Sequence, residues 1–261
     1  MKHARLALVT WAVSLIGTAA HAGSGTVSST ALPTAGRAIA AGPVSITIGE
    51  HEFGCGAARE VLVTVMNTST AAVPRSGKVV VTTGARSAEA AYSVGAGASQ
   101  SVKVRAASGM GCTGALQPLE VKVTDPQGAA LVTKSLKPKS FALSALAAQI
   151  YTQGGSPQTA SDHGIRRVSY TGDCATSGGG LGADILGGTQ AQAFSLTLKA
   201  NGVEGTATGN AAAGVSTPAQ FTAQVPVNCA QGPGAFSYKL TTGRTAEGTV
   251  TTGTVRYTLA P

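Results

Sequence analysis

Apolar and polar residues alternate along much of the chain, and this alternation predicts β-strands. Val44, Ile46 and Ile48 share one face of such a segment, while Ser45 and Thr47 take the other face. Successive side chains of a strand point to opposite faces, so the apolar positions predict a core face and the polar positions a solvent face. The same period of two recurs at residues 61–66, 102–105, 119–123, 194–199, 236–241 and 253–260.

Turn signals separate these segments at intervals of about ten residues, which is typical of β-sandwiches. Asn201-Gly202 is the strongest of them, because both positions of a tight hairpin turn need positive φ. We therefore predict an all-β fold of two tandem immunoglobulin-like sandwiches in preference to a closed barrel. Two segments fall outside this pattern. Residues 140–151 are the best helical candidate, with a linker plus a strand as the alternative, and the glycine-rich residues 177–188 are expected to form a flexible loop.

The N-terminus has the three parts of a secretory signal peptide. Lys2 and Arg5 precede an apolar stretch, and Ala20-His21-Ala22 supplies the small residues of a cleavage site. A membrane anchor is the alternative, but the apolar stretch is shorter than the ~20 residues that cross a bilayer. We expect residues 1–22 to be removed and no transmembrane segment to remain, so that the chain is exported to the periplasm, the cell surface or the medium.

Four cysteines remain after this processing, and an even number in an exported chain predicts disulfides. Cys55 and Cys112 lie 57 residues apart, and Cys174 and Cys229 lie 55 apart. The nearly constant offset between the two pairs favours a duplicated unit with one internal disulfide in each copy, although coincidence in an Ala-, Gly-, Thr- and Val-rich chain is the alternative. We therefore predict the pairs Cys55–Cys112 and Cys174–Cys229.

The cysteine pairs also suggest how the chain is divided. Residues 23–42 are small and polar, and are expected to form a flexible leader or a poorly ordered first strand. Residues 43–140 are expected to form the first sandwich and residues 141–261 the second. Aromatic residues make up only 4% of the chain, so the cores contain few large side chains and bury little apolar area. A disulfide in each sandwich is expected to supply part of the stability that such a core lacks.

The chain is basic, with a formal net charge of +8. Removal of Lys2 and Arg5 leaves 17 basic and 11 acidic residues, a net charge of +6. A basic surface attracts acidic polymers, and the candidate contacts are Lys134, Lys137, Lys139, Arg166 and Arg167. The alternative is ordinary solubilising charge on strand faces and edges. Few aromatic residues accompany the basic ones, so no stacking platform for nucleic-acid bases is expected.

Few residues suggest catalysis or metal binding. Glu50 and Glu52 would project from a strand on one side and His51 on the other, so an exposed polar turn is favoured over a metal site. His163 lies in a turn-rich stretch without a G-x-S-x-G nucleophile motif. The cysteine spacing matches neither redox nor zinc motifs. We therefore expect a non-enzymatic protein without a metal or cofactor, and keep a hydrolase that uses His163 as a remote alternative.

Two segments resemble known families. The stretch "VLVTVMNTSTAAVPRSGKVVVTTG" and the later "YSVGAGASQSVKVRA" resemble bacterial cell-adhesion-related immunoglobulin-like domains, in which Asn67, Gly97, Ser99, Val102 and Val104 occupy the motif positions. The extra disulfide departs from that pattern. "VPVNCAQGPGAFSYKLTTG" is similar to secreted pilus-type subunits of the spore-coat-protein-U-like group. Both resemblances imply spacer, adhesive or assembly modules.

These observations lead to two expected functions. The first is a secreted, non-enzymatic protein of surface adhesion or extracellular assembly, with a protein partner or its own copies as the binding partner. The second is a binding protein for an acidic surface polysaccharide, through a basic face of the first sandwich. Neither expectation rests on an identified site.

Overall fold

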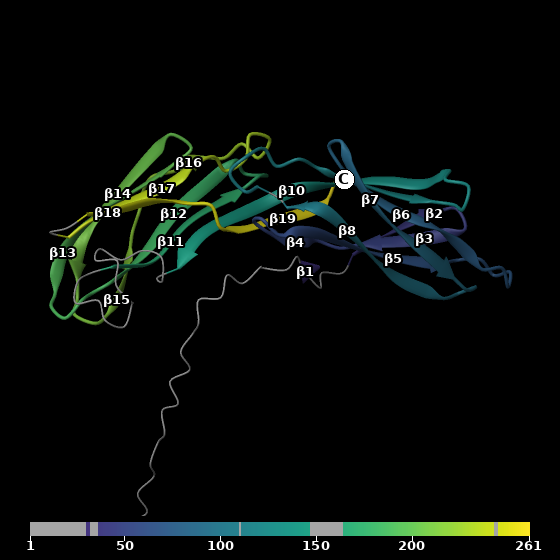
Figure 1. Cartoon of the computed structure of the whole chain (residues 1–261), viewed down its shortest axis with the longest axis horizontal. Coiled ribbons are helices and arrows are strands. Elements are labelled where there is room, and N and C mark those ends of the chain that lie inside the picture. The colour runs from purple at the N-terminus through teal and green to yellow at the C-terminus, as the bar shows by residue number, and fades with distance from the viewer. Residues whose placement is uncertain (1–29, 32–35, 110, 147–163, 243–244) are drawn as a thin grey trace, which may run out of the picture.

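The fold is built from strands alone among the residues that can be described (Figure 1). The computed structural model describes residues 30–31, 36–109, 111–146, 164–242 and 245–261. The expected signal peptide, residues 1–22, lies outside this part of the chain. Within the expected leader, Arg37–Ala41 forms strand β2, which pairs with β3 (Val44–Ile48).

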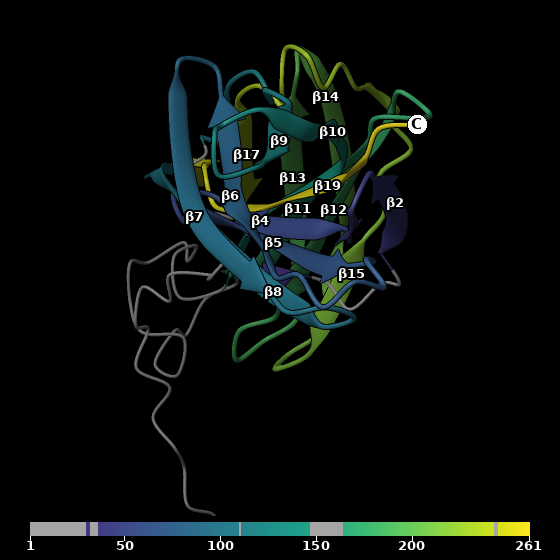
Figure 2. The ribbon, with the colours of Figure 1, turned by 90° about the vertical axis from the view of Figure 1, so that its right-hand side faces the viewer.

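Two small sheets pack against one large sheet, which runs the length of the molecule (Figure 1, Figure 2). In the first half, the small sheet has the order β2-β3-β5-β8, in which β5 is Ala58–Asn67 and β8 is Ser99–Gly109. In the second half, the order is β14-β13-β17-β18, with β13 (Gln192–Ala200), β14 (Val203–Ala211), β17 (Phe236–Thr241) and β18 (Thr245–Val250). The expected fold of two tandem β-sandwiches is confirmed.

The large sheet has the main order β1-β4-β19-β10-β11-β12-β15. These strands are β1 (Thr30–Ala31), β4 (His51–Gly54), β19 (Gly253–Leu259), β10 (Ala130–Leu146), β11 (Gly164–Asp173), β12 (Gly178–Leu186) and β15 (Ser216–Ala219). Four more strands attach beside this path: β9 (Leu119–Thr124), β6 (Arg75–Thr83), β7 (Arg86–Val94) and β16 (Val225–Pro226).

The alternation in the sequence predicted which side chains face the core. In β5, Val61, Val63 and Val65 are fully buried, while Met66 is exposed. The turn at Asn201-Gly202 has φ values of 52° and 80°, and it joins β13 to β14 as a tight hairpin. The strand and hairpin predictions are therefore confirmed at these positions.

Strand β10 belongs to both sandwiches. It pairs with β9 in the first half and with β11 in the second, and it carries a bulge between Pro138 and Ser140. The extra residue, Lys139, shifts the alternation by one position. As a result the buried Leu136 and the buried Phe141 lie on the same side of the sheet, although they are five positions apart, an odd spacing that would put them on opposite sides of a regular strand. One sheet can therefore serve two cores.

The last strand of the chain returns to the first half. Strand β19 lies between β4 and β10, with Tyr257 opposite His51 and Val255 opposite Phe53. Figure 1 accordingly shows the C-terminus in the middle of the molecule. The expected boundary between residues 140 and 141 falls inside β10, so two strands of the large sheet connect the halves.

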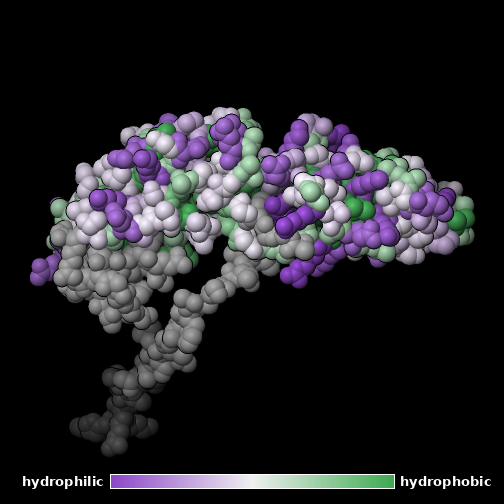
Figure 3. All heavy atoms as spheres, turned by 45° about the horizontal axis from the view of Figure 1, so that its top comes forward, coloured by the Kyte–Doolittle hydropathy of each residue, from purple (hydrophilic) through white to green (hydrophobic). Residues whose placement is uncertain are grey.

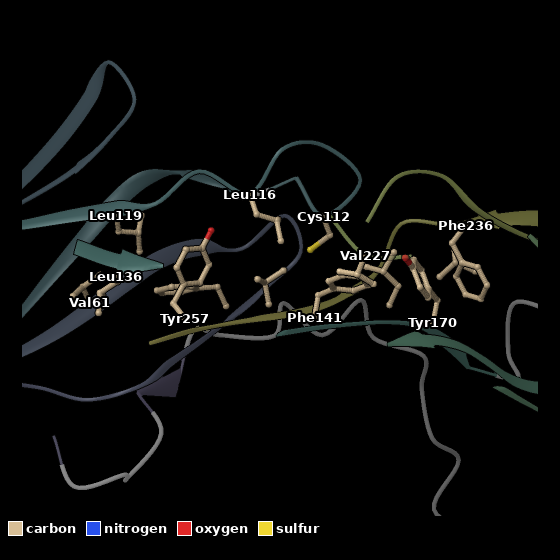
Figure 4. Packing of buried hydrophobic residues seen from close by; sticks show 14 of the residues in the cluster. Val61, Cys112, Leu116, Leu119, Leu136, Phe141, Tyr170, Val227, Phe236 and Tyr257 are labelled. Atoms are coloured by element: carbon tan, nitrogen blue, oxygen red, sulfur yellow. The ribbon is translucent and has the colours of Figure 1, made fainter. Parts of the chain in front are cut away.

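The core continues through the junction between the halves (Figure 4). The Phe53 and Tyr257 rings meet edge to face with centroids 5.4 Å apart, and the Phe141 and Tyr170 rings do so at 5.0 Å. Tyr170 also contacts Phe236, at 5.7 Å. Five aromatic side chains thus lie near the shared strands, where they join the two cores into one cluster.

The helix expected at residues 140–151 is wrong for its described part. Residues 140–146 continue β10, and Phe141, Leu143 and Ala145 are buried with period two. Neighbouring strands pair with this segment on both sides, and these tertiary hydrogen bonds outweigh the helical preference of its alanines and leucines. Residues 147–151 lie outside the described part.

The loop expected at residues 177–188 is also wrong for most of its length, because Gly178–Leu186 forms β12. Glycine suits this strand for packing reasons. A Cβ atom on Gly179 would lie 2.8 Å from the Thr171 carbonyl oxygen and 2.9 Å from Val227 Cγ2. The glycines therefore mark a close approach of neighbouring segments.

Candidate functional site at the junction

An open groove of about 500 Å³ lies where the two halves meet. It is formed mainly by the side chains that point away from the shared core. Its lining residues are Glu52, Ser140, Phe141, Ala142, Thr171, Gly172, Asp173, Thr176, Gly178, Gly179, Gly180, Gln224, Thr254 and Arg256. Because most of these residues lie on paired strands of one sheet, the backbone fixes their relative positions.

Opposite charges face each other along this side of the sheet. Arg256 Nη2 donates a hydrogen bond to Glu52 Oε2 at 3.2 Å across the β19–β4 pair. Nearby, Lys139 Nζ donates to Glu50 Oε1 at 2.6 Å. All four side chains are partly exposed, so each pair contributes no more than about 1 kcal/mol. Of these four residues, Glu52 and Arg256 line the groove, and their pairing balances the charge of its β4–β19 wall.

The other wall is built on the turn between β11 and β12. Asp173 Oδ1 accepts hydrogen bonds from the Ala175 and Thr176 backbone N–H groups, at 2.7 and 3.2 Å. This fixes the carboxylate as part of the turn. Gly178 and Gly180 leave the adjoining floor without side chains. Hydroxyl-bearing side chains also line the groove, namely Ser140, Thr171, Thr176 and Thr254.

His51 occupies a position that the sequence did not predict. It is 1% exposed, so the expected exposed polar turn is wrong. The Leu62 N–H donates to Nε2 at 2.9 Å, so Nδ1 carries the proton and donates to the Gly49 carbonyl oxygen, also at 2.9 Å. Burial lowers the pKa of the imidazole from 6.5, against the opposing effect of these backbone bonds. Both ring nitrogens are occupied, and His51 therefore acts as a structural link between β4 and β5.

A buried arginine and tyrosine near the junction were also missed. Arg59 is 7% exposed and donates from Nη1 to Thr83 Oγ1 at 3.2 Å. Burial lowers the pKa of Arg59, and burial raises the pKa of Tyr257 to about 12. The Tyr257 hydroxyl donates to the Gln117 carbonyl oxygen at 3.0 Å. Arg59 lies two positions before the buried Val61 in the same strand, so the alternation of the sequence places its side chain on the core face.

The structure does not bring the five predicted basic contacts to one surface. Lys134 points to the same side of β10 as the buried Leu136, and Lys137 points to the opposite side. Lys139 is paired with Glu50. The remaining two lie near the far end of β10, where Arg167 is opposite Leu146 and pairs with Asp184 at 3.1 Å, while its neighbour Arg166 is exposed. Contact with an acidic polymer stays a prediction.

Both predicted disulfides, Cys55–Cys112 and Cys174–Cys229, are confirmed, and both lie at the junction. The Cys55 N–H donates to Gly253 O at 2.8 Å, at the start of β19. The Cys174 N–H donates to Lys139 O at 2.9 Å, at the bulge of β10. Leu116, in the loop that carries Cys112, donates from its N–H to Cys229 O at 3.3 Å. The disulfides therefore hold the segments that connect the halves.

Over the described residues, no three His, Cys, Asp or Glu side chains gather in a way that suits a metal ion. His163 lies outside those residues. The described part of the chain also contains no helix with the length and apolar character needed to cross a membrane.

Comparisons with models of protein families and with curated proteins found no match to this chain. Fold and disulfides alone therefore define its class. It is an all-β protein of two immunoglobulin-like sandwiches, with disulfides that indicate a non-reducing environment.

Proposed function

We propose that the chain is an exported, non-enzymatic protein that acts in surface adhesion or extracellular assembly. The observation that carries this proposal is the construction of the junction. A shared sheet, a continuous core and two disulfides join the sandwiches into one elongated body. Domains joined by a small polar interface move relative to one another, whereas a large apolar interface holds them fixed. A stiff arm that keeps its shape in an oxidising space suits a spacer or an adhesive unit.

Export is tested by locating the protein in cells that produce the full chain from Met1. We expect the mature protein to begin at Gly23, to appear in the periplasm or the medium, and to contain no free thiol. Mass spectrometry of the intact protein with and without a thiol-alkylating reagent measures both features. A full-length cytosolic protein with four free thiols would contradict export.

Adhesion is tested by displaying the mature chain on the surface of a non-adherent bacterium. We expect displaying cells to aggregate or to attach to a surface more than cells that display the carrier alone. The matched control displays the chain after reduction and alkylation of its disulfides. Unchanged aggregation and attachment in the presence of the folded chain would count against the proposed function.

A further inference from the structure

One side of the first sandwich is formed by the open edges of two strands. Hydrophilic and hydrophobic side chains are interspersed over the face that Figure 3 shows, where the described residues are coloured. The backbone is therefore a better guide to a binding surface than any single patch of side chains. A strand at the edge of a sheet presents unpaired N–H and C=O groups, and these groups can bind a segment of another chain as an added strand.

The first open edge is that of β10, along residues 130–134. Strand β9 pairs with this segment on one side. On the other side, β19 pairs with residues 136–143, and the Ala260 N–H donates the last bond of the ladder to Ser135 O, at 2.8 Å. Within the described part of the chain, no strand continues this ladder along residues 130–134. Backbone groups alternate in direction along an antiparallel ladder, so the N–H and C=O groups of Thr133 face the open edge, as those of Ser135 do.

The second open edge is that of β2. This strand stands at the end of the sheet β2-β3-β5-β8, with β3 on its inner side. Ala41 is opposite Val44 across a tight turn, so the backbone groups of Ala41 and Ile39 face β3. Those of Ala38 and Ala40 consequently face away from the sheet. Figure 2 shows β2 and the C-terminus on the same side of the first half.

A cavity of about 310 Å³ lies between these two edges. Its lining residues are Arg37, Ala38, Ile39, Ala40, Lys134, Leu259, Ala260 and Pro261. Ile39 and Leu259 are partly buried and pack against the core, so the cavity is a continuation of the space between the two sheets. At the opposite margin of the sandwich, β7 and β8 lie against each other. The first sandwich is therefore closed at one margin and open at the other.

Two basic side chains line the cavity, and none of its lining residues is acidic. Lys134 has the inward orientation of the buried Leu136, and Arg37 has that of Ile39 and the buried Ala41. Neither basic side chain forms an ion pair with a described acidic residue. The cavity therefore combines aliphatic walls with positive charge.

The rest of the chain does not supply the missing negative charge. The only acidic residue outside the described part is Asp162, two positions before the start of β11 at Gly164. Arg167 of β11 pairs with Leu146 of β10, so β11 begins at the opposite end of β10 from Lys134. An acidic group that pairs with Lys134 must therefore come from a partner.

A polypeptide strand with both acidic and apolar side chains matches this surface. Its backbone would continue the β19 ladder past Thr133, and alternate side chains would enter the cavity toward Arg37 and Lys134. An inward-pointing lysine discourages pairing with a purely apolar strand, because its charge would be buried without a partner. An acidic side chain removes this cost and makes the edge selective. Pairing of two copies along this edge is disfavoured, since it would bring the basic residues of both copies together.

We propose that the first sandwich binds an extended, acidic segment of a different protein as an added strand beside residues 130–134 of β10. This inference rests on the proposed function in adhesion or assembly and names the kind of partner involved. The Thr133 backbone supplies main-chain hydrogen bonds to the partner, and Lys134 and Arg37 select its acidic side chains.

The test selects binders of the oxidised mature chain from a phage-displayed library of random peptides about ten residues long, enough for one strand. We expect the selected peptides to alternate acidic with apolar residues and to bind more tightly than about 0.1 mM in fluorescence anisotropy. A library that yields no binder, or only binders without acidic residues, would overturn the proposal.

Two matched pairs of variants locate the bound peptide. Thr133→Pro removes the N–H group at the open edge, where proline is tolerated, and should weaken binding about fivefold or more. Thr133→Ala keeps this group and should bind as the wild type does. Lys134→Glu should weaken binding about tenfold or more through repulsion, whereas Lys137→Glu, on the opposite face of β10, should have little effect. Equal affinities within either pair, measured on variants that melt as folded proteins, contradict this mode of binding.

The display assay separates this inference from the proposed function. We expect the free selected peptide to reduce the adhesion of displaying cells, and Lys134→Glu to reduce it more than Lys137→Glu. Equal adhesion of these two variants would overturn the inferred mode of partner binding and leave the proposed function intact. A wild-type chain that binds the peptide but promotes no adhesion would instead contradict the proposed function alone.

Discussion

Truncation of Phe141 should destabilise both halves of the molecule. Its ring is 3% exposed, packs edge to face on Tyr170 and lies directly over Gly172. Phe→Ala substitutions in cores cost about 3–5 kcal/mol, and the cost is highest where the surroundings cannot collapse into the cavity. Strand β10 is paired on both sides here, so little collapse is possible. We expect a loss of about 4 kcal/mol, a large share of the 5–15 kcal/mol of a typical domain.

Hydrogen exchange measured by mass spectrometry shows where that stability is lost. If the halves share one core, protection falls in β5 of the first sandwich as well as in β13 of the second, by similar free energies. Phe141→Leu is the control, with a smaller loss in the same two places because most of the apolar volume is kept. Faster exchange in β13 with unchanged exchange in β5 would refute the shared core.

Three further predictions concern single features of the structure. The pKa of His51 is lowered in the folded state, so the unfolded chain takes up the proton first as the pH falls below 6.5. Urea unfolding should therefore show a free energy of unfolding that decreases toward pH 5 by up to about 1.4 kcal/mol per pH unit. If the His51→Gln variant shows the same dependence of stability on pH, this prediction is contradicted. Gly179→Val should lower the free energy of unfolding by about 1–3 kcal/mol, because the added side chain overpacks the site. Gly180→Val is the control and should lower it much less, because a Cβ atom there meets only Thr171 Oγ1, at 3.7 Å. Equal melting temperatures of the two variants would contradict this prediction. The dispersed basic residues should release the chain from a heparin column below roughly 0.15 M salt; tighter retention would favour the acidic-polymer alternative.

The strands and the disulfides could be predicted because their signals are local or countable. The valines of β5 alternate without interruption, and the spacing of the cysteines distinguishes one pairing from the others. The position of β19 could not be predicted, since residues 253–259 have the same alternation as any strand and their partners, β4 and β10, are remote in sequence. The prediction for His51 was wrong because the polar residues on both sides of it suggested an exposed turn. His51 is two positions before the buried Phe53 in the same strand, and this spacing places its side chain in the core.

The most direct test of the account is differential scanning calorimetry of the oxidised mature chain. One sheet and one core that run through both sandwiches predict a single transition, with a calorimetric enthalpy equal to the van't Hoff enthalpy. Two resolved transitions, or a calorimetric enthalpy about twice the van't Hoff value, would show that the sandwiches unfold separately.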